Sequence, residues 1–168
     1  MLAHYLFPDY QDKETEENSF RYYEKITTHD SSLSTCVFSI MASRLGLKDK
    51  AYYYFGDSAK MDLLNTHKNS KDGIHAANMG GSYMAIVNGF ARVQAEEDKL
   101  FLAPALPENW QGYHFRIRYH GSLLEVSVNK ETCSIEQLEG IAITMELYGK
   151  EYVLEAANQK VEVPYQEN

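Results

Sequence analysis

The chain has 168 residues, of which 44% are hydrophobic, and it carries a formal net charge of −8 at pH 7. This length fits one domain or two halves that share a core, and the hydrophobic fraction excludes wholesale disorder. The acidic balance, without any basic stripe, argues against a nucleic-acid groove or an anionic membrane surface. We therefore expect no nucleic-acid partner and no membrane partner.

The cysteine content favours a reducing compartment. Cys36 and Cys133 lie far apart in the chain and form no CxxC motif. We expect no signal peptide, and no apolar run is long enough to span a bilayer. Two reduced thiols in a cytoplasmic protein are the simplest interpretation.

The first residues are apolar and aromatic from Met1 to Phe7, with no polar segment before them. Such a start is unusual for a self-contained domain. It indicates either a helix cut from a longer parent or a strand-like tail that needs a partner. The charged residues from Asp9 to Ser19 predict an exposed connecting loop.

Four helices are predicted in the first half by apolar residues at helical spacing. The first covers residues 16–26. The second is capped by Ser31 or Ser32 and ends at Gly46, and the third is capped by Asp49. The fourth runs from His75 to Asn88, and its small apolar residues predict burial on all sides. The buried faces of the first three are expected to be Phe20, Tyr23 and Ile26; Leu33, Val37, Ile40, Met41 and Leu45; and Tyr52, Phe55, Ala59 and Leu63.

The pattern changes near Arg92, after which apolar residues alternate with polar ones. Period-two alternation predicts strands, and His120-Gly121 and Gly149-Lys150 predict turns between them. The expected strand residues are Phe115, Ile117 and Tyr119; Leu124, Val126 and Val128; Ile141, Ile143, Met145 and Leu147; Tyr152 and Leu154; and Val161 and Val163. The chain is therefore predicted to be α+β, with a helical half before an antiparallel β half.

Two polar turns at predicted helix starts could bind an anion. One is the glycine-bracketed segment from Gly73 to Gly81, which contains His75, and the other runs from Thr28 to Ser34. Free backbone N–H groups at a helix start, beside hydroxyls and an imidazole, suit a small oxyanion such as phosphate. A structural interpretation stays open: the glycines permit close helix packing, His75 is a satisfied, partly buried histidine, and the serines only cap a helix.

Other site types have little support in the sequence. No GxxxxGK[ST] or GxGxxG motif is present, and the histidines show no metal-ligand spacing, so neither a nucleotide nor a metal ion is expected. Ser32, His75 and Asp30 could be assembled into a catalytic triad, but no nucleophile-elbow context surrounds the serine.

Four ordered segments carry a resemblance to a known family: Thr27–Ser34, Gly73–Gly81, Leu106–Trp110 and Phe115–Gly121. Together they resemble the C-terminal part of glycoside hydrolase family 65, the maltose, trehalose, kojibiose and nigerose phosphorylases, over about residues 1–130. The chain departs from the family at Tyr83 and Arg92, where the family usually has tryptophan and often has glycine.

The resemblance implies a fold and a domain boundary. Residues 1–91 would be the terminal helices of an incomplete (α/α)6 catalytic barrel, and residues 92–168 a small antiparallel β-sheet or sandwich domain. Since the family's other barrel helices lie upstream of these, the resemblance implies a truncated chain. It would self-associate or pair with a missing N-terminal part.

The resemblance also implies a reaction. In the family, inorganic phosphate is the co-substrate and attacks the anomeric carbon of an α-linked glucose disaccharide with inversion, which releases β-glucose 1-phosphate without a cofactor. The general acid is a glutamic acid upstream of this chain, so no catalytic residue is expected here and the chain alone would be inactive. Part of the phosphate site would come from Ser31 and Ser32 in one loop and Gly73, Ile74 and His75 in the other.

An alternative comes from the aromatic residues of the β half, among them Trp110. Aromatic side chains favour carbohydrate contacts, so this half could be a non-catalytic carbohydrate- or partner-binding module. Packing within the sheets explains the same residues equally well. An independent enzyme that uses local carboxylates is disfavoured because so few helices cannot enclose a substrate pocket.

Overall fold

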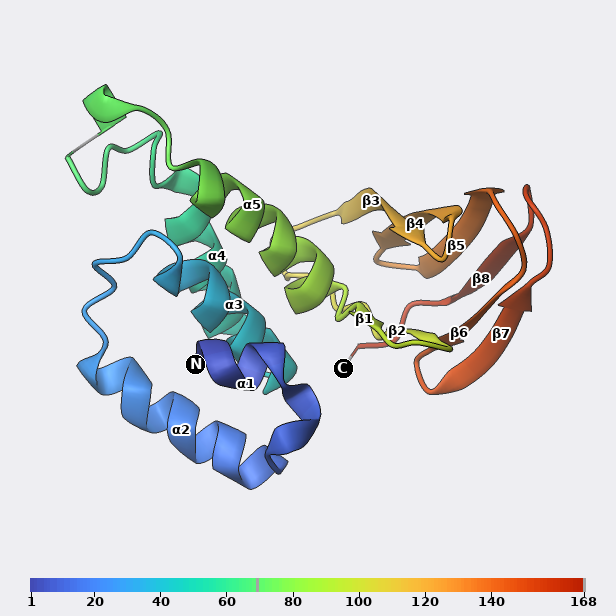
Figure 1. Cartoon of the computed structure of the whole chain (residues 1–168), viewed down its shortest axis with the longest axis horizontal. Coiled ribbons are helices and arrows are strands. Elements are labelled where there is room, and N and C mark those ends of the chain that lie inside the picture. Colours follow the sequence, from blue (N-terminus) through green and yellow to red (C-terminus); the bar gives the residue numbers. More distant parts are fainter. Residues whose placement is uncertain (69, 168) are drawn as a thin grey trace. The chain divides into compact units, whose positions relative to one another are not determined.

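The computed structural model describes residues 1–68 and 70–167, and its architecture is α+β (Figure 1). The contacts divide the chain into two compact units, Met1–Gly89 and Phe90–Asn168. The first unit contains α-helices with short 3₁₀ segments, and the second contains two four-stranded sheets. The order of helices before strands is the one that the sequence predicts.

The helical segments, in chain order, are α1 (Leu2–Leu6), the 3₁₀ turn η1 (Pro8–Tyr10), α2 (Lys13–Ile26), α3 (Ser34–Arg44), α4 (Lys48–Lys60), the 3₁₀ turn η2 (Ser70–Asp72), α5 (Ala76–Met84) and the π-helical segment η3 (Ala85–Phe90).

The helix α2 begins earlier than the sequence predicts. The Asp12 side chain accepts a hydrogen bond from the backbone N–H of Thr15 at 2.7 Å, and Glu14 and Glu16 lie in the first turn. A capping aspartate and two acids near the helix start stabilise it, so charged residues assigned to a loop become helical. The predicted loop over 9–19 is therefore wrong from Lys13 onward.

The helix α3 is at the centre of the helical unit. All nine residues from Thr35 to Ser43 are buried, whereas the sequence pattern predicts burial on one face. The difference arises because α1, α4 and α5 all contact this helix. A helix with neighbours on several sides buries serine and threonine as well as its apolar stripe. Ser39 satisfies its hydroxyl by donating to the backbone oxygen of Ala51 at 2.8 Å.

The helix α4 buries a different face from the predicted one. Its buried residues are Ala51, Tyr54 and Ser58, and the predicted Leu63 is 83% exposed. The Tyr54 ring packs 5.4 Å from the Phe38 ring, centroid to centroid, and small residues one turn away permit close approach. Ring packing and small side chains thus place the buried face of α4 one residue before the face that the spacing of apolar residues predicts.

The helix α5 is not buried on all sides, contrary to the prediction. Asn78 and Gly81 are buried, but Met79 and Tyr83 are 52% and 46% exposed. The main helical contacts of α5 are with α4 and α3. The predicted continuation to Asn88 also changes character, because the last turns adopt π-helical hydrogen bonding as η3.

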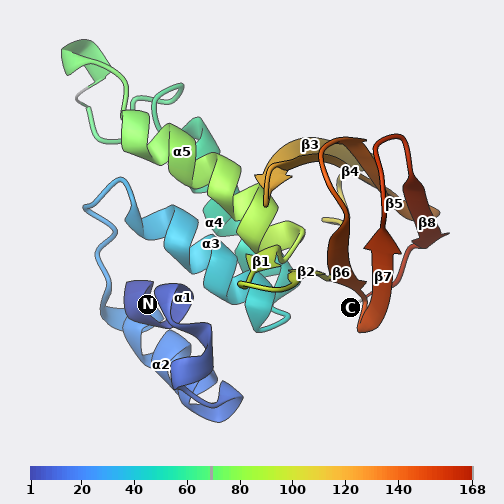
Figure 2. The same ribbon diagram turned by 45° about the vertical axis from the view of Figure 1, so that its right-hand side comes forward.

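The β unit contains two sheets whose strands are interleaved along the chain (Figure 2). One sheet has the order β1-β2-β6-β7, from strands Gln94–Ala95, Leu100–Leu102, Ile143–Leu147 and Lys150–Leu154. The other has the order β3-β4-β5-β8, from strands Gly112–Tyr119, Ser122–Asn129, Thr132–Glu139 and Lys160–Pro164. Their buried faces supply the apolar core of this unit.

The two predicted hairpin turns are confirmed. His120 and Gly121 have φ of 46° and 80°, and Tyr148 and Gly149 have φ of 52° and 76°. Two successive residues with positive φ are typical of the tight turns whose twist matches that of the flanking strands. The second turn lies one residue earlier than the sequence predicts.

The prediction of a purely antiparallel β half is wrong in one place. Strands β2 and β6 pair in parallel, with Leu100 opposite Met145. About forty residues separate these strands, and β3, β4 and β5 lie between them in the sequence. Parallel neighbours need such a long connection, which no local turn signal can reveal.

The strand β5 is absent from the prediction. Its buried residues include Ser134 and the fully buried Gln137 beside Cys133 and Ile135, so polar residues disguise its alternation. The buried amide of Gln137 donates to the backbone oxygen of Ile141 at 2.6 Å. Hydrogen bonding of this kind makes burial of a glutamine tolerable, and only the folded chain shows it.

Burial raises the pKa of the Cys133 thiol to about 11. In the unfolded chain the pKa of a cysteine thiol is about 8.5. The free energy of unfolding therefore falls as the pH rises above that value toward the pKa of the folded protein. We expect Cys133 to resist a disulfide reagent at pH 8 until denaturant is added. We also expect the urea midpoint to fall less between pH 8 and pH 10 in Cys133→Ala than in the parent. Equal pH dependence in both proteins would contradict this.

Candidate functional site

Both helices that follow the polar turns begin without a side-chain cap. The N-cap residues are Leu33 for α3 and His75 for α5, and neither helix start receives a capping hydrogen bond from these side chains. The first N–H of each helix, from Ser34 and from Ala76, donates to a backbone oxygen of the turn before it. The positive end of each helix dipole still favours an anion at these turns.

The serines do not cap α3 as the sequence predicts. The Ser31 backbone oxygen accepts a hydrogen bond from the N–H of Ser34 at 3.0 Å, which forms a turn ahead of the helix. The Ser31 hydroxyl is 3.4 Å from the N–H of Leu33, a long contact that holds the turn rather than the helix. Ser31 is exposed and Ser32 is half-buried, so neither hydroxyl is withdrawn into the core.

The two helix starts lie on adjacent helices. A Cβ on Gly81 would come 2.5 Å from the Cys36 Sγ and 3.9 Å from a methyl group of Leu33. This places the first turns of α3 against α5, and it confirms close helix packing at Gly81. Gly80 differs, because a Cβ placed there would have no neighbouring atom within 4 Å.

A pocket of about 600 Å³ opens between these elements. Ser31 and Ser34 line it from the turn and start of α3, and Ala77 lines it from the first turn of α5. Apolar residues of α1, among them Leu2, form another part of its wall. The structure therefore brings Ser31 and the start of α5 to one cavity.

The other predicted residues are not among those that line this pocket. Ser32 lies beside it in sequence, and His75 precedes the lining residue Ala77 by two positions. Gly73 has φ of 124°, a conformation suited to glycine, and Ile74 is 72% exposed. Whether these residues bind phosphate stays a prediction.

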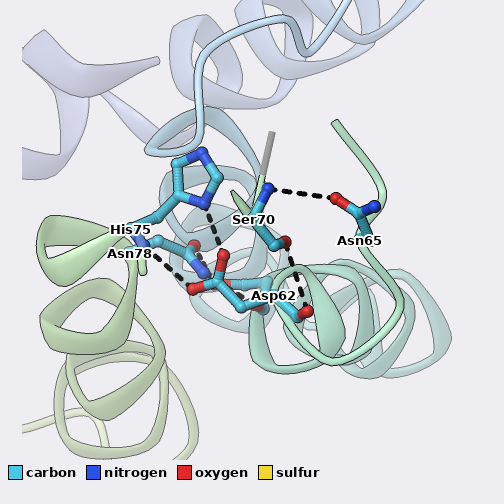
Figure 3. Close-up of polar contacts among 6 residues, drawn as sticks. Asp62, Asn65, Ser70, His75 and Asn78 are labelled. Atoms are coloured by element: carbon cyan, nitrogen blue, oxygen red, sulfur yellow. Dashed lines mark hydrogen bonds and ion pairs between the residues drawn. The ribbon is translucent and has the colours of Figure 1, made fainter. Parts of the chain in front are cut away.

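His75 is held by Asp62, which lies just beyond α4 (Figure 3). The Asp62 Oδ1 lies 2.5 Å from the His75 Nδ1, and the Oδ2 accepts the backbone N–H of His75 at 2.9 Å. These two hydrogen bonds hold the pKa of Asp62 below its usual range, and the bond from the ring has the larger effect. An ionised Asp62 accepts only, so Nδ1 carries the proton in this pair.

The start of α5 is also fixed to α4 by buried polar contacts. The Asn78 amide donates to the backbone oxygen of Ser58 at 2.8 Å, and the Asn78 Oδ1 accepts from the Ser58 hydroxyl at 2.8 Å. Both residues are almost fully buried, where leaving such groups unsatisfied is costly. His75 therefore stands one turn before an anchored residue.

His29 supports the other turn. Its Nδ1 lies 2.9 Å from the Ser34 Oγ, and its ring centroid lies 4.8 Å from that of Phe38 and 5.3 Å from that of Tyr54. Burial is the main cause that lowers the pKa of His29, which favours a neutral ring near pH 7. A neutral imidazole can pair with the Ser34 hydroxyl and hold the shape of the turn.

Asp62 and His29 have clear roles that sequence reasoning misses. Asp62 lies thirteen positions before His75 in no recognised motif, and His29 reads as one of six scattered histidines. The spacing of either residue carries no signal of its partner. Only the packing of α4 against α5, and of the turn against Phe38, brings these groups together.

The described residues offer neither a metal-binding cluster nor a membrane-spanning helix. Residues 1–68 and 70–167 contain no group of three or more His, Cys, Asp or Glu side chains placed to hold a metal ion. Within the same ranges, no helix has the length and apolarity that crossing a bilayer requires.

Two family models match the chain, and they divide it near the boundary between the helical and β units. The glycosyl hydrolase family 65 central catalytic domain matches residues 1–84, and the C-terminal domain of the same family matches residues 93–154.

Similar proteins include phosphorylases of trehalose and maltose. The chain is 53% identical to α,α-trehalose phosphorylase of Geobacillus stearothermophilus over 92% of its own length, and 36% identical to maltose phosphorylase of Bacillus subtilis strain 168 over 90%. In both cases it covers 20% of the relative's length.

A solved structure shows the same likeness in three dimensions. It is named as a candidate kojibiose phosphorylase from the human microbiome, and it matches 98% of this chain with a TM-score of 0.89 and 32% identity. The match covers 24% of that structure's chain. By its sequence and by its fold, the chain belongs to glycosyl hydrolase family 65.

Proposed function

We propose that this chain supplies part of the phosphate site of an inverting α-glucosyl disaccharide phosphorylase. The observation that carries the proposal is one pocket that Ser31 and Ser34 line from the start of α3 and Ala77 lines from the first turn of α5, the helix that His75 precedes. Phosphate would accept hydrogen bonds from the hydroxyls of Ser31 and Ser32 and from backbone N–H groups near Gly73 and Ile74. The His75 imidazole would provide a further contact.

The proposed chemistry is direct attack of bound phosphate on the anomeric carbon of an α-linked glucose disaccharide. Inorganic phosphate is the co-substrate, and no metal or organic cofactor is part of the proposal. Helix dipoles and directed N–H groups would orient the phosphate oxygens. Bound phosphate would then be held close to the geometry that attack on the anomeric carbon requires. Phosphate takes the position of the activated water of an inverting hydrolase, so no second carboxylate serves as base.

The proposal assigns the general acid to polypeptide outside these 168 residues, so the chain alone would be inactive. Residues 1–91 would complete a helical barrel, and residues 92–168 would form its C-terminal β domain. Leu2, Leu6 and Phe7 are 55%, 56% and 62% exposed, and such apolar side chains favour a covering partner. Self-association, or pairing with an N-terminal part, would cover them. We place this assembly in the cytoplasm.

The proposal is tested with the purified chain and inorganic phosphate. Added phosphate is expected to raise the melting temperature progressively, because stabilisation grows with the logarithm of one plus the ratio of phosphate concentration to Kd. The double variant Ser31→Ala/Ser32→Ala is expected to lose most of that rise. Chloride at equal ionic strength is the control for general salt effects. A melting temperature that responds equally to phosphate and chloride would contradict the proposal.

Activity is measured in the same preparation as release of glucose 1-phosphate from trehalose, maltose and kojibiose. No release is expected from the chain alone, because it lacks the general acid of the proposed reaction. Release would show that a carboxylate within these residues protonates the leaving sugar, and it would overturn the assignment of an incomplete site.

The alternative of a carbohydrate-binding module on the β unit gains no support from Trp110. Its ring centroid lies 5.3 Å from that of Phe90 and 5.9 Å from that of Tyr113. These contacts account for Trp110 by packing within the β unit. Disaccharide binding by the chain without any phosphate response would restore this alternative.

A further inference from the structure

We propose that Asp62 is a positioning residue for phosphate, which fixes the tautomer and direction of the His75 ring so that Nε2 is the atom presented to the ligand. The inference rests on the proposed phosphate role of His75 and adds a residue to it. Asp62 does not touch phosphate in this arrangement and acts through the imidazole.

The geometry couples one carboxylate to two groups of the same residue. The Asp62 Oδ1 accepts a hydrogen bond from the ring Nδ1–H of His75, and the Oδ2 accepts one from the backbone N–H of His75. Two contacts of this kind fix both the rotation of the side chain and the position of its backbone. Within the described part of the chain, Asp62 is the only hydrogen-bonding partner of the His75 side chain.

The backbone at Asp62 is tied to the loop that precedes His75. The Ser70 hydroxyl lies 3.4 Å from the backbone oxygen of Asp62, and the Ser70 N–H donates to the Asn65 Oδ1 at 3.1 Å (Figure 3). The side chains of His75 and Asp62 are only 20% and 14% exposed. Partial exclusion of water strengthens their mutual hydrogen bond, which favours one orientation of the ring.

The consequence for the ring is the same in either protonation state. With Nδ1–H committed to Asp62, the neutral ring presents the lone pair of Nε2, which accepts from a phosphate hydroxyl. The imidazolium presents Nε2–H instead, which donates to a phosphate oxygen. Nδ1 is unavailable to phosphate in both states, so a single ring orientation serves the site.

A purely structural interpretation makes a different prediction. Asp62 could serve only to accept the backbone N–H at the start of α5, as a capping residue does. Asp62→Asn separates the two roles because an amide oxygen still accepts that N–H. The Asn NH₂ group would then face Nδ1 as a donor, which moves the neutral ring's proton to Nε2.

The electrostatic effect of the same substitution has the opposite sign. Asp62→Asn removes a negative charge near the proposed phosphate, and a loss of like charge should by itself tighten anion binding. The positioning role predicts weaker binding, because an amide NH₂ group that faces Nδ1 leaves no acceptor for Nδ1–H. The doubly protonated ring, which would bring a positive charge to phosphate, then loses its partner. Asp72→Asn removes the same charge from the neighbouring turn η2 without touching His75 and is the matched control.

The first measurement is ¹⁵N NMR of the His75 ring in the chain without phosphate. Protonated Nδ1 and unprotonated Nε2 are expected in the neutral ring of the parent and of Asp72→Asn, and the reverse in Asp62→Asn. A neutral ring protonated at Nε2 in the parent would overturn the proposal, and this result needs no variant to fold.

The second measurement is the phosphate affinity of the three proteins. We expect Asp62→Asn to bind about tenfold more weakly or worse, and Asp72→Asn to bind as well as the parent or better. Equal affinity in parent and Asp62→Asn would overturn the role of Asp62 while the phosphate site stands. No phosphate binding by the parent, with the expected tautomer, would overturn the phosphate role of His75 and with it the purpose assigned to Asp62.

Discussion

His75→Ala is expected to remove most of the stabilisation that phosphate gives to the chain. The imidazole would form a hydrogen bond to an anion, and loss of such a bond weakens binding by about 2 kcal/mol, or about thirtyfold. The measurement is the rise in melting temperature over a phosphate titration, compared between variant and parent. The rise is compared rather than the absolute temperature, because the variant also deprives Asp62 of its ring contact.

His114→Ala is the matched control for this experiment. His114 is exposed on β3 in the β unit and lies outside the proposed site, so its removal should leave the phosphate response unchanged. Equal responses to phosphate in the parent and in His75→Ala would exclude His75 from the site. Equal losses in His75→Ala and His114→Ala would indicate a nonspecific effect of either substitution.

Gly140→Ala is expected to destabilise the β unit by about 4 kcal/mol. Gly140 has φ of 107°, a backbone conformation that an alanine adopts only with strain. A Cβ there would lie only 2.4 Å from the Cα of Ser122. Ser122 is fully buried, and its hydroxyl donates to the backbone oxygen of Ile141 at 2.8 Å, so it cannot easily move aside. The backbone strain at position 140 and the overlap with Ser122 therefore both lower the stability of the variant.

Gly121→Ala separates these two contributions. Gly121 has φ of 80°, yet a Cβ at this position meets nothing within 4 Å. Its substitution should cost only the conformational strain, about 1 kcal/mol. Urea unfolding followed by tryptophan fluorescence measures both variants, since Trp110 lies in the β unit. Similar losses in the two variants would show that the contact with Ser122 is relieved at little cost.

The order of helices before strands was predictable because it depends on local periodicity. The buried side of β4, formed by Leu124, Val126 and Val128, follows from spacing alone. On α2 the same rule is right for Phe20 and wrong for Tyr23 and Ile26, which are 44% and 57% exposed. The hairpin turn at His120-Gly121 follows from the residue types that tolerate positive φ. Chain-local rules therefore decide the identity of these elements.

The faces of α4 and α5 were not predictable, because they depend on which neighbours are present. Tyr54 packs against the rings of His29 and Phe38, whereas Met79 on α5 is 52% exposed. The parallel pairing of Leu100 with Met145 likewise joins segments far apart in sequence. Contacts of this range carry no local signal.

The sequence alone determined the family and predicts the residues of the proposed phosphate site, because both depend on the order and type of side chains along the chain. Ser31, Ser32 and His75 stand out as polar residues at two glycine- or serine-rich helix starts. The tertiary structure alone decided which groups hold them. The pairing of Asp62 with His75 across thirteen residues exists because α4 and α5 pack together, and no spacing rule contains that contact.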